Sequence, residues 1–165
     1  MQKNKKVGNI YKISISESTH TYGRQIDNYI FTFFDLFVDT ELSKDEIVSA
    51  KPLFSLGVHK DVFKKSRWEL IGNIPLTDSE IANPPLFFKQ DIGNASLCWI
   101  VNTKGEEKKV SPDLCIGLER LASWDYQQVE GRLRDVFLKR ENKFAKSMEV
   151  TIPSYGSSEI VLNVL

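Results

Sequence analysis

Side chains that could carry out catalysis are sparse in this chain. Its two histidines are His20 and His59, so an imidazole acting as a general base would have to be one of these. His20 stands at a predicted turn and His59 precedes Lys60 and Asp61, and both settings are typical of solvated loop histidines. The chain has no Gly-x-Ser-x-Gly nucleophile elbow and no Gly-x-x-x-x-Gly-Lys phosphate loop. The sequence therefore predicts no catalytic residue and no enzymatic activity.

Metal and thiol chemistry have equally little support. Cys98 and Cys115 lie far from the two histidines in sequence, without the short paired spacing of a zinc site. Each cysteine stands in an apolar stretch, which favours a buried free thiol, and a disulfide remains the alternative. The adjacent carboxylates Glu106 and Glu107 lie in a charged turn and are expected to face solvent. We therefore predict neither a metal nor a cofactor.

Charge is distributed unevenly along the chain. Residues 17–46 contain seven acidic side chains against Arg24 and Lys44, a local net charge of −5 in a chain whose overall charge is zero. One interpretation is the ordinary unevenness of a neutral surface, and the other is an acidic surface that mimics phosphate or meets a basic partner. Basic side chains between residues 60 and 67 are diluted by Asp61, so a solvated loop is the simpler interpretation there.

Length and composition place the chain among single globular domains. Its 165 residues suffice for one domain, residues 1–165, and the 41% apolar content excludes a disordered linker. Equal numbers of basic and acidic residues argue against a dedicated nucleic-acid or membrane-surface binder. The start of the chain lacks an apolar signal-peptide core, and the hydrophobic cluster from Tyr29 to Val38 is too short to cross a bilayer. We therefore expect a cytoplasmic protein without a membrane partner.

The elements that must position any site are mostly strands in the first two-thirds of the chain. Alternating and β-branched residues predict strands near 10–16, 20–26 and 29–34, followed by others at 53–58, 67–72 and 86–88 and a hairpin over 97–110. Ser43 and Glu46 fit a capping box that begins a short helix. Later, apolar residues at three- and four-residue steps predict a helix from about Leu118 to Lys139.

The remaining segment, after residue 140, predicts two strands, Met148 to Ile152 and Glu159 to Leu162, separated by a Pro-Ser-Tyr-Gly turn. These elements together indicate an α+β fold. We expect an N-terminal antiparallel β-meander, or partly open barrel, packed against one long C-terminal helix, with a terminal strand pair.

The order of several short motifs is more specific than any one of them. These motifs are Gly-x-Ile-Tyr-Lys-Ile from Gly8, Tyr-Gly-Arg around Gly23, Phe-x-x-Gly-Val ending at Val58, and Trp-x-x-Ile-Gly-x-x-Pro-Leu from Trp68. In this order and spacing the chain resembles the immunity protein 26 family, which accompanies bacterial polymorphic and contact-dependent toxins. The similarity runs from about Val7 to Leu86 and more loosely through Trp124 to Arg132.

The resemblance implies a protein that binds and blocks a cognate toxin, with a toxin C-terminal domain as its 1:1 partner and no cofactor or nucleic acid. Residues of the shared motifs are then structural: Gly8, Gly23, Trp68, Gly72, Pro75 and Trp124. For the toxin contact we hypothesise the acidic residues Asp35, Asp39, Glu41, Asp45 and Glu46, which would suit a nuclease with a basic cleft. Asp45 and Glu46 would also stabilise a helix start, so the first three are preferred.

Two other classes of function stay open. A small β-barrel-like module could bind nucleic acid or a peptide, with Tyr22, Tyr29 and Phe31 exposed as a stacking platform. A degenerate or unrecognised enzyme is the third hypothesis. Tight 1:1 binding to the product of the adjacent gene would favour the toxin inhibitor over both.

Overall fold

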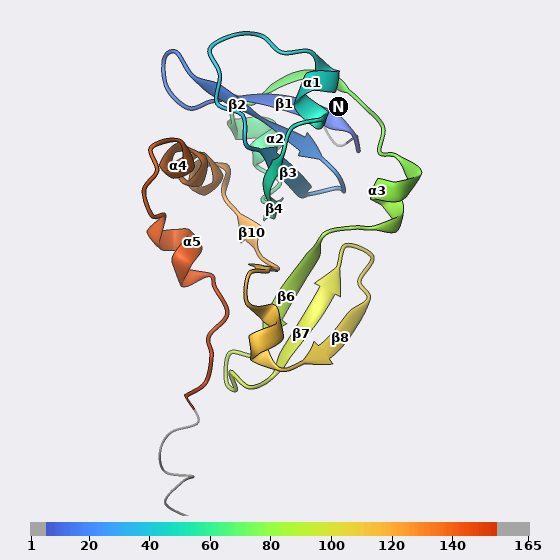
Figure 1. Cartoon of the computed structure of the whole chain (residues 1–165), viewed down its shortest axis with the longest axis vertical. Helices are drawn as coiled ribbons and strands as arrows, with labels where there is room; N and C mark the ends of the chain where they lie inside the picture. Colours follow the sequence, from blue (N-terminus) through green and yellow to red (C-terminus); the bar gives the residue numbers. More distant parts are fainter. Residues whose placement is uncertain (1–5, 155–165) are drawn as a thin grey trace, which may run out of the picture.

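Two β-sheets and several short helices form the protein in a computed structural model that describes residues 6–154 (Figure 1). The larger sheet has six strands in the order β10-β4-β3-β2-β1-β5. Successive strands from β1 to β4 pair antiparallel, which confirms the predicted meander, and only β10 runs parallel to its neighbour. The strands are β1 (Asn9–Ser14), β2 (His20–Gln25), β3 (Ile30–Phe34), β4 (Pro52–Val58), β5 (Glu69–Asn73) and β10 (Ser123–Trp124).

The smaller sheet follows in sequence and has the order β8-β7-β6-β9. Its strands are β6 (Leu86–Gln90), β7 (Cys98–Asn102), β8 (Glu107–Val110) and β9 (Glu119–Arg120). Cys98 and Cys115 are both free and buried against Phe88 in its core, as predicted. Burial raises the pKa of the Cys115 thiol to about 11, and the neighbouring Cys98 thiol acts in the same direction. In Figure 1 this sheet lies below the six-stranded one.

In the described part of the chain, five α-helices and one 3-10 turn connect and cover these strands. They are α1 (Lys44–Val48), α2 (Val62–Lys65), α3 (Asp78–Ala82), η1 (Pro112–Cys115), α4 (Tyr126–Phe137) and α5 (Lys143–Ser147). The Ser43 hydroxyl accepts a hydrogen bond from the backbone N–H of Glu46, so α1 begins where the capping signal predicted. Within residues 6–154 no helix combines the length and apolarity needed to cross a membrane.

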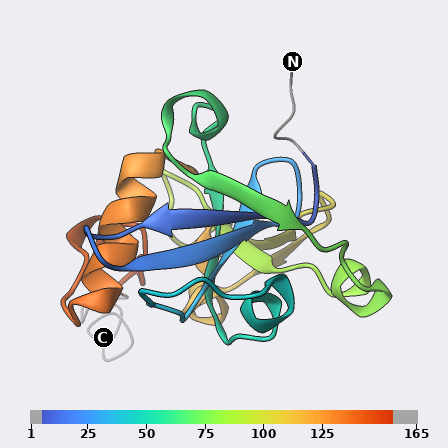
Figure 2. The ribbon, with the colours of Figure 1, turned by 90° about the horizontal axis from the view of Figure 1, so that it is seen from above.

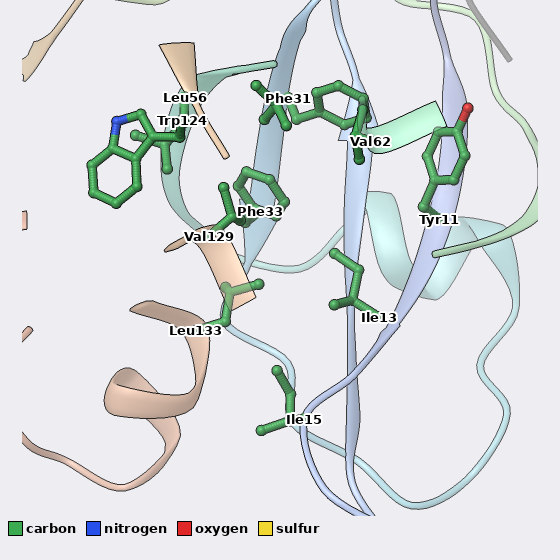
Figure 3. Packing of buried hydrophobic residues seen from close by; sticks show 11 residues of the cluster. Tyr11, Ile13, Ile15, Phe31, Phe33, Leu56, Val62, Trp124, Val129 and Leu133 are labelled. Atoms are coloured by element: carbon green, nitrogen blue, oxygen red, sulfur yellow. The ribbon is translucent and has the colours of Figure 1, made fainter. Parts of the chain in front are cut away.

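One face of the six-stranded sheet, here called the α4 face, carries the main hydrophobic core (Figure 3). Alternate residues of β1 and β3 point into it, and α2 and α4 close it from outside. Val129 and Leu133 stand one helical turn apart on α4, which is why this helix packs here. The buried members are Tyr11, Ile13, Ile15, Phe31, Phe33, Leu56, Val58, Val62, Trp124, Val129 and Leu133.

The opposite face, here called the α1 face, carries a smaller core. Ile10 and Tyr22 project from the sheet toward α1, which contributes Ile47 to the same cluster. Ile10 and Tyr11 are neighbours in β1 yet belong to different clusters, because successive strand residues point to opposite faces. Figures 1 and 2 both show α1 and α3 on the side of the molecule away from α4.

Two parts of the predicted fold are wrong. The expected long helix from Leu118 begins only at Tyr126, because residues 119–120 and 123–124 pair as β9 and β10 and the Gln128 side chain caps the helix by accepting the N–H of Asp125. Met148 to Ile152 forms no strand, and residues 159–162 lie outside the described part of the chain. No pair of strands within residues 6–154 closes the larger sheet, so it is open, as an antiparallel meander or a partly open barrel would be.

Candidate functional site

The acidic residues proposed for partner contact lie along one surface segment between β3 and β4. Asp35, Asp39, Glu41, Asp45 and Glu46 are all exposed. The segment is fixed at its start by a hydrogen bond from the Asp35 N–H to the Lys51 carbonyl, at 2.8 Å. Further along, Val38 and His20 exchange two backbone hydrogen bonds, which hold the loop against the start of β2. The structure therefore presents these carboxylates to solvent from a segment that is held in place.

One of these carboxylates has a local partner. The ammonium group of Lys12 lies 2.5 Å from Oε1 of Glu41 and donates a hydrogen bond to it. This contact lowers the pKa of Glu41 and raises the pKa of Lys12 from their ordinary values. Ion pairs of the other four acids do not occur within residues 6–154. Asp35 and Asp39 thus offer a partner more available charge than Glu41 does.

The shared-motif residues in the first half of the chain occupy structural positions. Gly8 has a φ of +94°, and a Cβ added there would lie 2.5 Å from the carbonyl oxygen of Ile74. At Gly23 in β2 a Cβ would lie 2.9 Å from the Phe33 ring, so the ring of the neighbouring strand occupies the space of a side chain there. Gly72 lies in β5 opposite Ile10, and Pro75 follows the end of that strand.

The two motif tryptophans pack against the α4-face core. Trp124 in β10 is 1% exposed and meets the Phe144 ring edge-on, with ring centroids 4.8 Å apart. Trp68 is half-buried just before β5, and its ring meets those of Phe31 and Phe33 edge-on. Its indole N–H donates a hydrogen bond to Glu130 of α4 at 3.3 Å. Both rings therefore join the sheet to the helices that cover it.

A groove of about 600 Å³, here called the α1–α3 groove, opens on the α1 face. It lies between α1, α3 and the β7–β8 turn, over a stretch of sheet that carries Thr32 and Ser55. The hydroxyl oxygens of these two residues are hydrogen-bonded to each other at 2.8 Å. Most of the lining is apolar: Val7, Ile26, Phe34, Val48, Ala50, Pro52, Leu76, Ile81, Pro84 and Pro85.

Arg24 lines this groove and anchors the segment that leads to α3. Its side chain is 5% exposed and lies 2.7 Å from the carboxylate of Glu80. Its other terminal nitrogen donates to the carbonyl oxygens of Ile74 and Pro75, at 2.7 and 2.9 Å. Sequence reasoning missed both Arg24 and the groove, because the lining residues come from segments spread between residues 7 and 104. A lone arginine inside a strand was the one available signal.

The histidines show no arrangement suited to catalysis. His20 was predicted to be a solvated loop residue, and this is wrong. It begins β2, is 7% exposed, and its Nε2 lies 2.8 Å from the Tyr22 hydroxyl. His59 is partly exposed beside Asp61, with 3.6 Å between Nδ1 and the carboxylate. Groups of three or more His, Cys, Asp or Glu able to hold a metal ion do not occur within residues 6–154.

The aromatic platform expected of a nucleic-acid-binding module is not present as predicted. Tyr22 and Phe31 are fully buried, on opposite faces of the sheet. The Tyr29 ring is partly buried and lies 6.1 Å from the Phe63 ring. Since strands with both faces covered bury their alternating aromatics, two of the three proposed rings cannot stack on a base.

Comparison with known proteins gives one match. The family model described as immunity protein 26 matches residues 6–98. No curated protein and no solved structure matches the chain. The matched region holds β1 to β6, α1 to α3 and most of the lining of the α1–α3 groove. Because the match covers more than half of the chain, the protein belongs to the immunity protein 26 family.

Proposed function

We propose that this protein binds a cognate bacterial toxin in the cytoplasm and neutralises it by occlusion, without catalysis. The partner is the C-terminal domain of that toxin, bound 1:1. The observation that carries the proposal is the family match over residues 6–98, since an immunity protein family suggests toxin neutralisation. A nuclease-type toxin is the partner that the acidic segment 35–46 fits best, because a nuclease must present a basic cleft to a phosphate backbone.

The side chains of the protein support occlusion over catalysis. His20 is hydrogen-bonded inside the fold, and the Cys115 thiol has a pKa raised by burial, so neither is poised to act on a substrate. Occlusion needs only a fixed surface with complementary shape and charge. The segment from Asp35 to Glu46 provides such a surface, held by the pairing of Val38 with His20 and by the cap on α1.

We further infer that residues 1–165 act as one domain. The chain passes from β9 of the smaller sheet directly to β10 of the larger one. Arg132 of α4 binds both carboxylate oxygens of Glu119 in β9, at 2.6 and 3.0 Å, and its guanidinium lies over the Phe54 ring of β4. This arginine therefore links both sheets through one side chain.

Titration of the toxin domain encoded beside this gene tests the proposal. We expect the protein to protect cells that express the toxin, and purified toxin activity to fall to zero at one equivalent. Light scattering of a complex with catalytically inactive toxin should give the mass of a 1:1 assembly. Complete inactivation by a small fraction of an equivalent would indicate catalysis, and absence of binding would remove the proposed function.

A further inference from the structure

We propose that the α1–α3 groove receives an apolar side chain from a loop of the toxin, and that lysine or arginine residues beside that side chain contact the carboxylates of α1 and α3. This inference rests on the proposed function and names the contact face and the chemistry of the partner segment. It extends the predicted acidic surface across α1 and into a cavity that sequence reasoning did not find.

The two helices that border the groove share one arrangement. In α1, Val48 lines the groove, while Asp45 and Glu46 are exposed in the first turn of the helix. In α3, Ile81 and Glu80 line the groove, and Asp78 is exposed at the start of the helix. Each helix therefore offers one apolar side chain to the cavity and carries two carboxylates. Apolar centres with charged surroundings are the usual anatomy of protein interfaces.

Charge at the groove favours a basic segment of the partner. Arg24 is buried and already paired with Glu80, so its charge is compensated within the fold. Asp27 lines the groove, and the carboxylates of Asp45, Glu46 and Asp78 are exposed on the two helices that border it. The opposing cations are Lys104 of the β7–β8 turn, which lies at the lining, and the exposed Lys44 at the start of α1. These four carboxylates outnumber the two cations, and this excess of negative charge is complementary to lysine or arginine.

The shape and lining favour a protein loop over a small polar ligand. Ile81 is 52% exposed although it lines the cavity, so a partner side chain would cover surface that water now reaches. The hydroxyls of Thr32 and Ser55 are satisfied by each other, and apolar side chains make up most of the lining. A volume of about 600 Å³ accommodates a large apolar side chain together with neighbouring backbone.

An isoleucine-to-arginine pair provides a matched test. Ile81→Arg places a cation at the groove, and Ile92→Arg makes the same change in the turn between β6 and β7, where Ile92 is fully exposed. Both positions are solvent-exposed, so both variants should keep the wild-type unfolding temperature. The probe is the inactive toxin domain encoded by the adjacent gene, measured by calorimetry. We expect Ile81→Arg to weaken binding roughly 30-fold or more, as at an interface hot spot, and Ile92→Arg by less than about twofold.

A second variant separates lost apolar contact from added charge. Ile81→Ser should weaken binding by roughly tenfold, with Ile92→Ser as its control. Equal affinity of the Ile81 and Ile92 variants would overturn the groove inference while wild-type binding still supported the proposed function. Failure of the wild-type protein to bind the toxin would instead overturn the proposed function itself. Tight binding of a small molecule in the groove without any effect of the Ile81 variants on toxin affinity would also reject the inference.

Discussion

The two faces of the six-stranded sheet are covered to different extents. On the α4 face eleven buried residues form one cluster, and Trp124 and Leu133 are among its fully buried members. On the α1 face four buried residues form the cluster around Ile47, and the rest of that face opens into the α1–α3 groove. Side chains of the same strands point to both faces, so the difference in burial comes from the helices and loops that cover each face. We infer that the α4 face supplies stability and that the α1 face supplies recognition.

Strand alternation explains how one sheet can serve both tasks. In β3, Phe31 and Phe33 point into the α4-face core, while the intervening Thr32 points to the groove. A change at Thr32 can therefore alter the groove without removing atoms from the main core. Under the proposed function, this separation would let the contact surface vary between family members while the scaffold stays constant, and specificity between partners would follow.

The largest effect is expected on the α4 face. Trp124→Ala should lower the free energy of unfolding by about 3–5 kcal/mol, because it removes a fully buried ring and leaves a cavity. Chemical denaturation monitored by circular dichroism measures this change. Leu138→Ala, at a position 49% exposed, should cost less than about 0.5 kcal/mol and serves as the control. A loss below about 1 kcal/mol in Trp124→Ala would contradict the assignment of stability to this face.

A smaller loss of stability is expected from breaking the ion pair between Arg24 and Glu80 on the α1 face. Glu80→Gln removes the carboxylate that pairs with Arg24. We expect this change to lower the free energy of unfolding by about 1–2 kcal/mol. The loss is limited because Glu80 is 41% exposed and Arg24 keeps its bonds to two carbonyl oxygens. Hydrogen exchange should show faster opening of α3 in the variant. Unchanged exchange in α3 would show that the Arg24–Glu80 pair does not hold this wall of the groove.

Association with the toxin should respond to the acidic segment more weakly than to the groove. Replacing Asp35, Asp39 and Glu41 with Asn, Asn and Gln should slow association by roughly three- to tenfold at low salt, because steering by charge is lost. The difference should shrink as salt is added. Stopped-flow mixing at two salt concentrations measures both effects.

A control with the same change of charge sharpens this prediction. Three exposed acids away from this segment and from the groove can be neutralised together: Asp113 with Asn, and Glu141 and Glu149 with Gln. We expect this variant to associate at close to the wild-type rate. Equal slowing in both triple variants would mean that net charge alone, and no particular face, sets the rate.

The smallest expected effect concerns how the stability of the protein depends on pH. The contribution of one carboxylate on the α1 face and that of one on the α4 side should change in opposite directions as pH rises. On the α1 face the Lys12 contact lowers the pKa of Glu41, so its stabilisation is present above the ordinary carboxyl pKa and lost as pH falls. On the α4 side burial raises the pKa of Glu130, so stability is lost as pH rises through that raised value. Across the acid range, the wild-type protein should gain stability relative to Glu41→Gln and lose it relative to Glu130→Gln as pH rises. The free energy of unfolding of each protein is measured by chemical denaturation at several pH values. If it changed with pH to the same extent in the wild type and in both variants, this prediction would be contradicted.

Local patterns predicted much of the scaffold. The meander followed from β-branched and aromatic runs, and α1 followed from Ser43, because both signals act over a few neighbouring residues. The helix prediction failed at its start because Leu118 and Leu121 have helical spacing but stand beside two-residue strands. Asp125 interrupts the apolar residues of this stretch, and it is the N-cap at which α4 begins.

The candidate site was less accessible from the sequence. Acidic residues are exposed nearly everywhere, so their solvent exposure was easy to predict while their role was not. Tyr22 and Phe31 could not be recognised as buried, because alternation shows that two sets of residues face opposite ways but not that both faces are covered. The groove depends on bringing Thr32, Ser55 and Ile81 together through the tertiary fold. Such non-local proximity leaves no periodic signal in one sequence.

Hydrogen exchange of the 1:1 complex with the inactive toxin domain tests the central claim most directly, because it maps both faces in one experiment. We expect toxin binding to slow exchange in residues 35–48 and 78–85, which form the acidic segment, α1 and α3. Exchange in α4 should stay as it is in the free protein. Protection confined to α4 and α5, with no change at α1 and α3, would contradict the assignment of recognition to the α1 face.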